Sequence, residues 1–348
     1  MASQTAVYIV GARGYSGQVL VQLCQRHPEI KLAGLCVTDA SWSPSETFPF
    51  LSGVPALDVD SVLNTLSKDD CVFLATPAGA SNSLAPKFLD AGAKVIDLSG
   101  AFRLPPDERG SWYPLDWPAD LDFSSIAFGI QPFDSPSQQT RLVSNPGCYA
   151  TASMLALIPL LKASLIETDW VVVDAKSGVT GAGRKATESL LFSEVDEDFR
   201  AYRVFKHQHQ PEIEYTCQRL TGQEVSLQFT THLVPMKQGL QVSLYAKSKS
   251  KSLDIDTLLK AYQDAFEQDP FVRVEAFESD QGESVLAKTA MVKGSPYAGI
   301  ACAVSKGQVF ASCVIDNLWK GAASQAIQNF NAIYGLDSWS GLVEVGDS

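Results

Sequence analysis

The sequence has little positive charge and no long uninterrupted apolar run. Its 27 Lys and Arg residues are outnumbered by 39 Asp and Glu residues, which gives a net charge of −12. Because nucleic acids and anionic membranes attract basic surfaces, we expect neither of them as a partner. No apolar stretch approaches the roughly 18 residues of a transmembrane helix. The first residues also lack the basic segment and apolar core of a secretory signal.

Histidine is rare, and the cysteines show no pairing pattern. There are four His and seven Cys residues, an odd number of thiols that are scattered along the chain without a C-x-x-C pair. This pattern indicates reduced thiols in the cytoplasm rather than a disulfide framework or a zinc site. At 348 residues the chain exceeds one ordinary core, so we expect two domains.

The first third of the chain alternates between two kinds of pattern. Short apolar, β-branched runs predict strands at residues 6–10, 31–37, 71–76 and 94–99. Apolar residues at helical spacing follow the first run, and a second helical stretch covers 81–92. Alternating strands and helices predict right-handed crossovers and a parallel sheet. Six prolines at positions 105–136 predict a loop-rich crossover over residues 101–146.

Three glycines follow the first predicted strand and precede a predicted helix. Gly11, Gly14 and Gly17 would let the backbone approach a pyrophosphate, to which the helix start offers N–H groups and a positive dipole. This context favours dinucleotide binding over an ordinary glycine-rich turn. Arg13 suits a 2′-phosphate, whereas Asp39 suits an unphosphorylated ribose. The spacing alone therefore leaves NADP and NAD both open.

A lone cysteine lies between a Pro-Gly turn and a long apolar segment. Asn145, Pro146 and Gly147 form a turn sequence, and the residues after Cys148 suit a buried helix that continues to about Lys162. The start of a helix stabilises a thiolate through its N–H groups and dipole. We interpret Cys148 as a nucleophile, whereas the alternative is a small buried apolar residue.

A nucleophilic cysteine needs a proton-transfer partner, and the four histidines are the candidates. His207 and His209 would share a face if their segment is extended. Two histidines without a third ligand at a familiar spacing do not make a zinc site, so we predict no metal. His209 is the favoured base. His27 is expected at the surface, and His232 in a strand.

Two further stretches offer groups that bind anions. Residues 171–189 predict a strand followed by a glycine-rich loop that contains Ser177, Gly178, Arg184 and Lys185. Ser99 and Arg103 come at the end of a predicted parallel strand, where open α/β sheets bind ligands. The alternative for Arg184 and Lys185 is an ordinary mobile loop with a solvated basic pair.

Seven short motifs occur in a fixed order along nearly the whole chain, from about Ala6 to Leu342. They are GARGYSG, LATPAG, DLSGAFRL, NPGCYATA, SGVTGAGRKA, KHQHQPEIE and DNLWKGAASQA. In these motifs the chain resembles the N-acetyl-γ-glutamyl-phosphate reductase family of arginine biosynthesis, within the larger semialdehyde-dehydrogenase group. The P-G-C-Y and H-x-P-E-I elements are the most specific, and the glycine loop is the least.

The resemblance implies an α/β fold with a Rossmann dinucleotide-binding domain and a second α/β domain that has a large mixed sheet. The expected boundaries are 1–147 completed by 317–348 for the first domain and 148–316 for the catalytic and oligomerisation domain. It also implies a homo-oligomer, either dimer or tetramer, and NADPH as the cofactor. Cys148 matches the family's nucleophile, and His209 its acid–base group.

The predicted reaction reduces a small acyl phosphate to an aldehyde through a cysteine thioester, with release of phosphate. The predicted cofactor-binding residues are Gly11, Arg13, Gly14, Tyr15, Ser16, Gly17, Thr76, Pro77, Ser177, Gly178 and Asn317. The predicted substrate-binding residues are Ser99, Arg103, Arg184, Lys185 and His207. Asn317 matches a position near the nicotinamide amide, and Asp316 or Asn317 is also expected to cap a helix.

Two stretches depart from the family's pattern. Residues 127–133 (AFGIQPF) lack its usual acid, and in 231–239 Thr231 replaces a proline while Lys237 and Gln238 stand where an arginine is expected. We expect these stretches to shape the acyl pocket. The alternatives are therefore a related reductase for carrier-linked aminoadipyl phosphate or aspartyl phosphate, or a non-catalytic dinucleotide-binding redox sensor.

Overall fold

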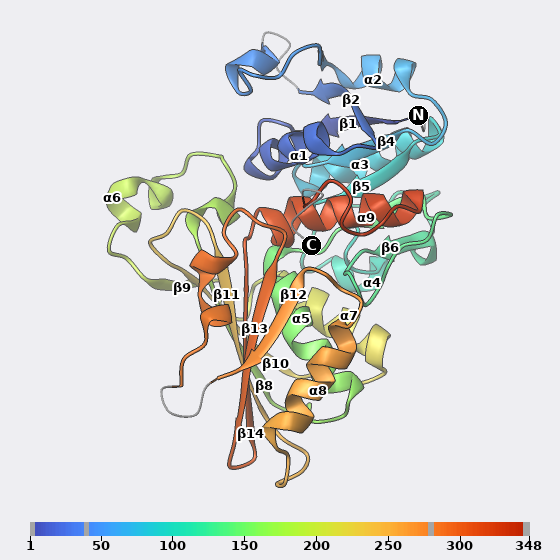
Figure 1. Ribbon diagram of the computed structural model, residues 1–348. Helices are drawn as coiled ribbons and strands as arrows, with labels where there is room; N and C mark the ends of the chain where they lie inside the picture. Colours follow the sequence, from blue (N-terminus) through green and yellow to red (C-terminus); the bar gives the residue numbers. More distant parts are fainter. Residues whose placement is uncertain (1–3, 38–41, 278–281, 344–348) are drawn as a thin grey trace. The chain divides into compact units, whose positions relative to one another are not determined.

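The chain folds into two compact units. The computed structural model describes residues 4–37, 42–277 and 282–343, and Asp39 lies outside them. One unit comprises Met1–Pro146 with Ala322–Ser348, and the second comprises Gly147–Gly321. Figure 1 labels the helices and strands of both. Residues 317–321 pack with the second unit rather than the first, because Gly321 lies against Cys148.

The first unit is built on a seven-stranded sheet in which every pair of neighbouring strands is parallel. In sheet order the strands are β3 (Ala56–Leu57), β2 (Ile30–Cys36), β1 (Thr5–Val10), β4 (Cys71–Leu74), β5 (Lys94–Asp97), β7 (Leu142–Ser144) and β6 (Ile126–Phe128). The four predicted strands and the parallel sheet are confirmed. The prediction of a loop-rich crossover missed β6 and β7, because three-residue strands are too short to show a period.

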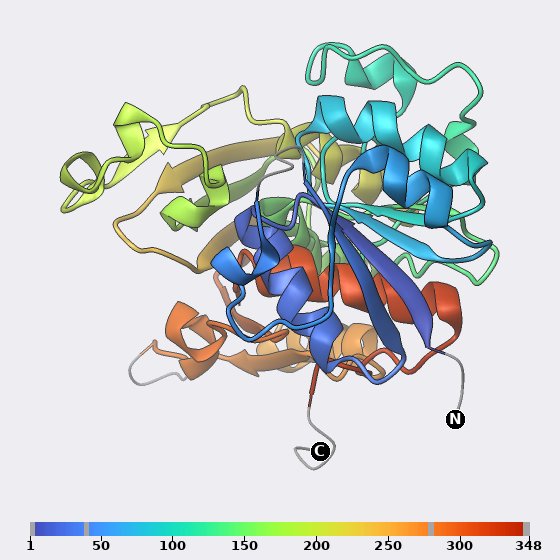
Figure 2. The same cartoon turned by 90° about the horizontal axis from the view of Figure 1, so that it is seen from above.

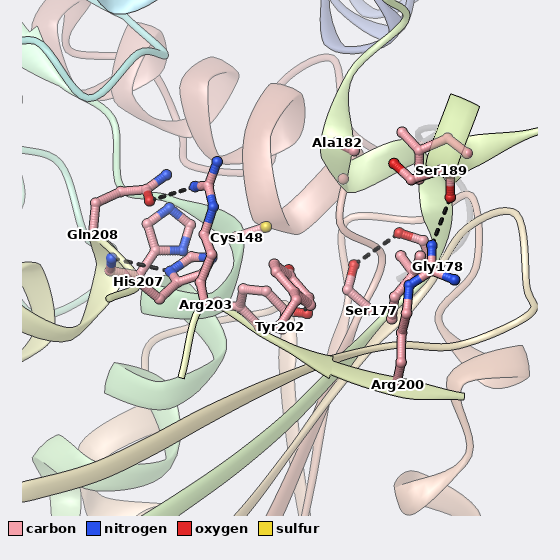
Figure 3. A pocket seen from close by; sticks show the side chains of 15 residues that line it. Cys148, Ser177, Gly178, Ala182, Ser189, Arg200, Tyr202, Arg203, His207 and Gln208 are labelled. Atoms are coloured by element: carbon pink, nitrogen blue, oxygen red, sulfur yellow. Dashed lines mark hydrogen bonds between the residues drawn. The ribbon is translucent and has the colours of Figure 1, made fainter. Parts of the chain in front are cut away.

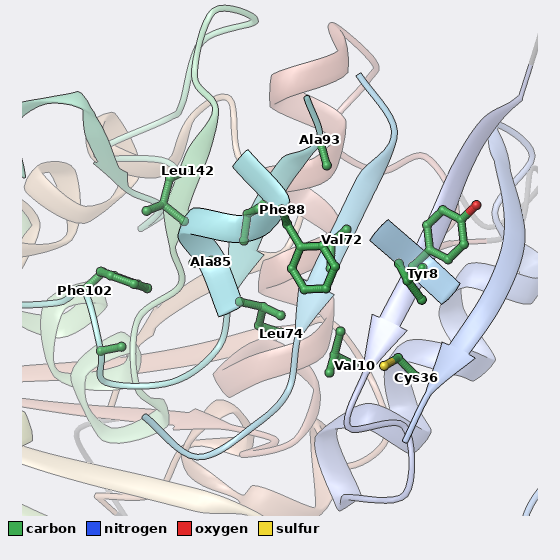
Figure 4. Close-up of a cluster of buried hydrophobic side chains, with 13 residues drawn as sticks. Tyr8, Val10, Cys36, Val72, Leu74, Ala85, Phe88, Ala93, Phe102 and Leu142 are labelled. Atoms are coloured by element: carbon green, nitrogen blue, oxygen red, sulfur yellow. The ribbon is translucent and has the colours of Figure 1, made fainter. Parts of the chain in front are cut away.

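Helices cover both faces of this sheet. They are α1 (Tyr15–Arg26), α2 (Val59–Thr65), α3 (Ala78–Asp90), α4 (Pro106–Arg109) and α9 (Ser324–Tyr334). On the α9 face, the ring of Phe73 from β4 lies 6.2 Å from that of Phe330. On the opposite face, Val62 of α2 and Phe88 of α3 pack with Val72 in a buried apolar cluster (Figure 4). Figure 2 shows α9 in red and α3 in cyan on the two sides of the strands.

His27 has a different environment from the one that its sequence context predicts. It follows α1 directly and is 2% exposed rather than at the surface. Its Nε2 lies 2.8 Å from the Oδ1 of Asn331 in α9. Burial lowers the pKa of His27 below its usual range. The prediction of a surface histidine is wrong because α9, which follows more than three hundred residues of chain, covers this end of α1.

The second unit contains a mixed seven-stranded sheet. Its strands, in sheet order, are β12 (Val272–Ala276), β13 (Ala298–Ser305), β14 (Gln308–Ile315), β11 (Leu240–Lys247), β8 (Val171–Ser177), β10 (Leu227–Leu233) and β9 (Arg200–Tyr202). The pairs β12–β13 and β8–β10 are parallel, and the other pairs are antiparallel. The prediction of a large mixed sheet is confirmed.

Helices cover one face of this second sheet. These helices are α5 (Cys148–Lys162), α7 (His209–Thr221) and α8 (Ile255–Phe266). Val171, Val173 and Ala175 of β8 are buried on this face, whereas Val172 and Asp174 between them are half-buried. Strand β8 thus has one covered and one open face.

Short helices occupy several of the connections. They are α6 (Phe192–Val195), the 3₁₀ helices η1 (Pro44–Glu46), η2 (Phe123–Ser125), η3 (Val179–Ala182), η4 (Glu188–Leu190), η5 (Val285–Ala287) and η6 (Thr289–Met291), and the π-helical turn η7 (Trp319–Ala323). Of these, α6 and η4 belong to an exposed segment between β8 and β9, drawn in yellow-green in Figure 1.

Candidate active site

The glycine loop lies where strand order reverses in the first sheet. Gly11 follows β1 with φ of +89°, and a Cβ there would lie 2.4 Å from the carbonyl oxygen of Ala75 after β4. A Cβ on Gly17 would lie 2.3 Å from the oxygen of Gly11. Only glycine fits these two positions. Open α/β sheets bind ligands at such a reversal.

Helix α1 points its first N–H groups at this crevice. Gly14, which has no side chain to cap the helix, precedes α1, and the first helical hydrogen bond runs from Gln18 N–H to the Gly14 oxygen. The N–H groups of Tyr15, Ser16 and Gly17 therefore precede the helical ladder and are available to a phosphate. The exposed guanidinium of Arg13 lies 5.9 Å from the Trp42 ring. The loop thus fits a dinucleotide pyrophosphate.

Thr76 and Pro77 follow β4 on the same edge. The Thr76 Oγ1 is hydrogen-bonded to Ser81 Oγ at 2.9 Å, and Pro77 immediately precedes α3. Since Gly11 contacts the neighbouring Ala75, these two residues adjoin the glycine loop. The structure therefore brings the predicted cofactor-binding residues of the first unit together.

Ser99 and Arg103 make internal hydrogen bonds after β5. Ser99 Oγ donates to Asp97 at 2.7 Å and accepts from the N–H of Ala101 at 3.0 Å. Arg103 donates through Nε to the oxygen of Asn145 at 2.9 Å. Burial raises the pKa of Asp97 above its usual range. Both side chains hold this edge of the sheet, and their binding of substrate stays a prediction.

Cys148 is the first residue of α5, as predicted. The helix is mainly apolar, and all residues from Tyr149 to Leu161 are buried. Gly147 precedes it, and no acidic residue lies in its first turn. The thiol is half-buried at a helix start where N–H groups and the dipole favour a thiolate. The position of this candidate nucleophile is therefore fixed by the core of the second unit.

The two neighbouring histidines lie at the start of α7. His209 begins that helix, so the segment is not extended, and the rings of His207 and His209 lie 4.7 Å apart. The N–H of His209 donates to His207 Nδ1 at 3.2 Å. Burial, together with the charge of Arg203, lowers the pKa of His207 to about 4. His207 is then neutral, with its proton assigned to Nε2 because Nδ1 accepts.

Glu212 connects the cysteine and histidine segments. It is fully buried in the first turn of α7, and its Oε1 accepts the N–H of Gly147 at 2.8 Å. Its Oε2 lies 3.9 Å from Nε2 of His209. One carboxylate therefore fixes the backbone before the thiol and faces the imidazole. The H-x-P-E-I motif contained this residue, but its sequence context indicated no role for it.

The thiol and both imidazoles line a cavity of about 490 Å³, a size typical of small-molecule sites. Figure 3 shows Sγ of Cys148 pointing into the space between the His207 side and Ser177 with Gly178. The residues that line the cavity are Cys148, Tyr149, Ser177, Gly178, Gly181, Ala182, Ser189, Leu190, Arg200, Tyr202, Arg203, His207, Gln208, His209 and Leu233.

The cations that line this cavity differ from the predicted pair. Arg184 and Lys185 are exposed and do not line it, whereas Arg200 and Arg203 do. The residues at 127–133 do not line it either, and of 231–239 only Leu233 does. Their expected role in the acyl pocket stays a prediction. Arg200 and Arg203 lie shortly before His207 in the sequence, and this closeness is the signal that could have identified them.

A buried polar network supports the back of the site. Asp316 accepts the N–H groups of Leu318 and Trp319 and so caps the following turn, whereas Asn317 accepts from Gly239 N–H at 2.9 Å and donates to Thr180 at 3.0 Å. Gln238 donates to Asp316 at 2.6 Å. Gln238 is one of the two residues that stand where the resemblance leads us to expect an arginine. Its neutral amide thus supplies the donor to Asp316.

Gly321 closes this network onto the thiol. A Cβ there would lie 2.7 Å from Cβ of Cys148. Its N–H donates to the oxygen of Asp316 at 2.9 Å. The absence of a side chain at Gly321 therefore allows the turn after Asp316 to approach the start of α5.

The described part of the chain has neither a metal-binding cluster nor a membrane-crossing helix. Within residues 4–37, 42–277 and 282–343, no group of three or more His, Cys, Asp and Glu side chains is placed to hold a metal ion. In the same ranges, no helix combines the length and the apolar character that crossing a membrane requires.

Comparison with known proteins gives three findings. Family models described as "Semialdehyde dehydrogenase, NAD binding domain" and "Semialdehyde dehydrogenase, dimerisation domain" match residues 6–135 and 148–317. The chain is 41% identical over 346 residues to an N-acetyl-gamma-glutamyl-phosphate reductase of Geobacillus sp. (strain WCH70), covering 97% of this chain and 98% of the relative. It is 39% identical to a protein of the same name from Bacillus cereus (strain AH187), with 97% of each chain covered.

The third finding concerns solved structures. An aspartate semialdehyde dehydrogenase II from Vibrio cholerae, complexed with ASA, superposes with a TM-score of 0.69 at 15% identity, covering 96% of this chain and 99% of the other. An aspartate semialdehyde dehydrogenase from Francisella tularensis gives 0.68 at 14% identity, covering 95% and 100%. At this identity the likeness shows the fold alone.

Proposed function

Since the chain belongs to the N-acetyl-gamma-glutamyl-phosphate reductases of the semialdehyde dehydrogenase family, we propose that it reduces N-acetyl-γ-glutamyl phosphate to N-acetylglutamate semialdehyde with NADPH, releasing phosphate. The observation that carries this proposal is the cavity in which Cys148, at the start of α5, shares a wall with His207 and His209.

Cys148 is the nucleophile of the proposed reaction. Its thiolate attacks the acyl carbon, the bond to the phosphate oxygen breaks, and phosphate leaves with the electron pair, so that a thioester forms on Sγ. N–H groups at the start of α5 are available to the oxyanion of the tetrahedral state, since the helix start leaves them outside the helical ladder. NADPH, when bound, supplies the hydride that reduces this thioester.

His209 is the acid–base group in this proposal. It gives a proton to the oxygen that becomes negatively charged upon reduction and takes it back as the aldehyde forms and the thiolate leaves. Glu212 lies 3.9 Å from its Nε2 and favours the charged imidazole at that stage. Because the same carboxylate holds Gly147, Glu212 is a positioning residue for both partners.

The first unit would bind the cofactor in the glycine loop. Gly11 and Gly17 admit only a hydrogen, and the N–H groups of Tyr15 and Ser16 begin α1. A dinucleotide pyrophosphate suits these donors. We assign the remaining cofactor contacts of this unit to Arg13, Gly14, Thr76 and Pro77, and those of the second unit to Ser177, Gly178 and Asn317. The exposed Arg13 suits the 2′-phosphate of NADPH.

We further propose that the protein works as a homo-oligomer in the cytoplasm. The second unit matches a model described as a dimerisation domain, and the open face of its sheet carries Trp170 and Tyr245, which are 54% and 50% exposed. A second copy on this face would cover these side chains. A reducing compartment would keep Cys148 as the thiol that the chemistry needs.

The test is a phosphate-dependent assay in the reverse direction. Reduction of NADP⁺ should require both N-acetylglutamate semialdehyde and phosphate, and Cys148→Ser should abolish turnover while leaving NADP⁺ binding nearly intact. Turnover with aspartate semialdehyde in place of the acetylated substrate would contradict the assigned substrate. Loss of cofactor binding in Cys148→Ser would assign the cysteine a structural role instead.

A further inference from the structure

One wall of the cavity is formed by the segment from Arg200 to His209. Strand β9 carries Arg200 and Tyr202 and leads into Arg203, whose backbone is left-handed with φ of +48°. Phe205 is also left-handed, with φ of +56°. Residues other than glycine and asparagine rarely adopt this left-handed backbone conformation. Residues that do adopt it are frequent at ligand clamps and active sites. The turn thus holds the Arg203 backbone in an unfavourable conformation beside the candidate nucleophile.

The two arginines in this wall have different electrostatic partners. Arg200 pairs with Asp198, and its guanidinium also donates to the backbone oxygens of Ser189 and Glu194. Arg203 donates through one nitrogen to Oε1 of Gln208 at 2.7 Å, and this partner is neutral. The charge of Arg200 is therefore locally balanced by a carboxylate, whereas Gln208 only orients the guanidinium of Arg203.

The rest of the cavity does not offset this charge. Among the described residues that line it, none is Asp or Glu. Arg203 is exposed, and Figure 3 shows it beside His207 and Gln208 on one side of Cys148. The neutral His207 adds a hydrogen-bond donor to the same wall through Nε2. In a protein with a net charge of −12, this wall is a local site of positive charge.

We propose that Arg203 determines substrate specificity by binding an anionic group of the acyl phosphate substrate with its guanidinium fork. The proposal rests on the proposed function and extends it to a residue that the sequence motifs did not indicate. The substrate carries two such groups, the α-carboxylate and the acyl phosphate. Both match the planar fork of donors that arginine presents, which lysine does not reproduce.

The test compares Arg203→Gln with the wild type in the reverse reaction. Gln keeps much of the side-chain length but removes the charge and the fork. We expect kcat/KM to fall about ten- to hundredfold, through KM more than kcat, because charged hydrogen bonds carry discrimination of this size. A rise confined to the KM of the semialdehyde identifies the carboxylate as the ligand, and a rise confined to the KM of phosphate identifies the phosphate. Unchanged KM values for both overturn the proposal.

Lys206→Gln is the matched control, because it removes one positive charge from the same exposed turn at a residue that does not line the cavity. Its KM values should equal those of the wild type. Arg203→Lys should recover only part of the loss. Equal thermal midpoints and NADP⁺ affinities in Arg203→Gln and the wild type show that the fold is retained.

A binding measurement separates failure of this inference from failure of the proposed function. N-acetyl-L-glutamate, a dicarboxylate that needs no turnover, should slow alkylation of Cys148 by iodoacetamide in the wild type. In Arg203→Gln the concentration that gives half protection should rise about tenfold or more. Equal protection of the two proteins by N-acetyl-L-glutamate and, in a parallel experiment, by inorganic phosphate refutes the role of Arg203. An inactive wild type that still shows the difference refutes the reductase assignment and keeps the anion site.

Discussion

A methyl group added at Gly321 should disable the site without removing any functional group. The Cβ of Gly321→Ala would lie 2.7 Å from Cβ of Cys148 and 3.2 Å from its Cα. Carbon atoms in ordinary contact are about 3.5–4.0 Å apart, so one of the two segments must move by roughly 1 Å. Helix α5 is buried along almost its whole length and cannot shift cheaply.

A displacement of this size at a reacting atom costs roughly a hundredfold in rate. We therefore expect kcat of Gly321→Ala to fall by about this factor, and the free energy of unfolding to fall by about 1–3 kcal/mol from overpacking. Both quantities can be measured on one preparation, kcat from the reverse assay and stability from urea unfolding. NADP⁺ should still bind, because the glycine loop that would hold its pyrophosphate belongs to the other unit.

Gly110→Ala provides the control for adding the same methyl group. A Cβ at Gly110 meets no atom within 4 Å, and its φ of −55° suits any residue. Its kcat and stability should match the wild type. If Gly321→Ala is as active and as stable as Gly110→Ala, the close packing of the turn after Asp316 on Cys148 is wrong.

Three more predictions concern single side chains. Glu212→Ala leaves the N–H of Gly147 without its acceptor and should lower the free energy of unfolding by about 1–3 kcal/mol. Glu212→Gln keeps an acceptor oxygen, so its free energy of unfolding should fall less. Equal decreases for the two variants in urea unfolding would contradict this role of Glu212. In the unfolded chain histidine has a pKa near 6.5, whereas the pKa of His207 in the folded protein is about 4. The unfolded state therefore binds the proton first, and the free energy of unfolding should fall by at most about 3 kcal/mol from this group as the pH drops from 6.5 to 4. His207→Gln should lose less stability over the same pH range. Gly11→Ala places a Cβ 2.4 Å from the Ala75 oxygen at a positive φ. Its NADP⁺ dissociation constant, measured by fluorescence, should rise about tenfold or more. An unchanged dissociation constant would show that the glycine loop does not bind the cofactor.

Local patterns in the sequence predicted the parts of the fold that local forces determine. The β-branched runs at 6–10 and 71–76 are strands because a buried parallel strand is apolar on both faces. Cys148 begins a helix because a Pro-Gly turn precedes an apolar segment without acidic residues. Gly11 adopts a left-handed φ, as a strand-to-helix turn around a phosphate requires.

Contacts between distant segments account for what the sequence did not predict. Nothing near His27 indicates that α9 will bury it. Arg184 and Arg203 are both basic residues beside plausible motifs, and only the course of the chain after β8 decides which of them lines the cavity. In the sequence, Glu212 looks like any acidic residue of a helix. Its hydrogen bond with Gly147, 65 residues earlier, and its approach to His209 become visible only in the folded chain.

The candidate nucleophile lies on a buried helix, whereas much of the surface that would recognise the substrate lies on an exposed stretch. Cys148 sits on a helix whose interior position ties it to the stability of the whole second unit. The part of the cavity lining from Ser189 to Arg203 belongs to an outlying stretch with exposed Leu191, Phe192 and Phe199. Replacing that stretch would therefore change the lining of the cavity while leaving the buried helix that carries Cys148 in place.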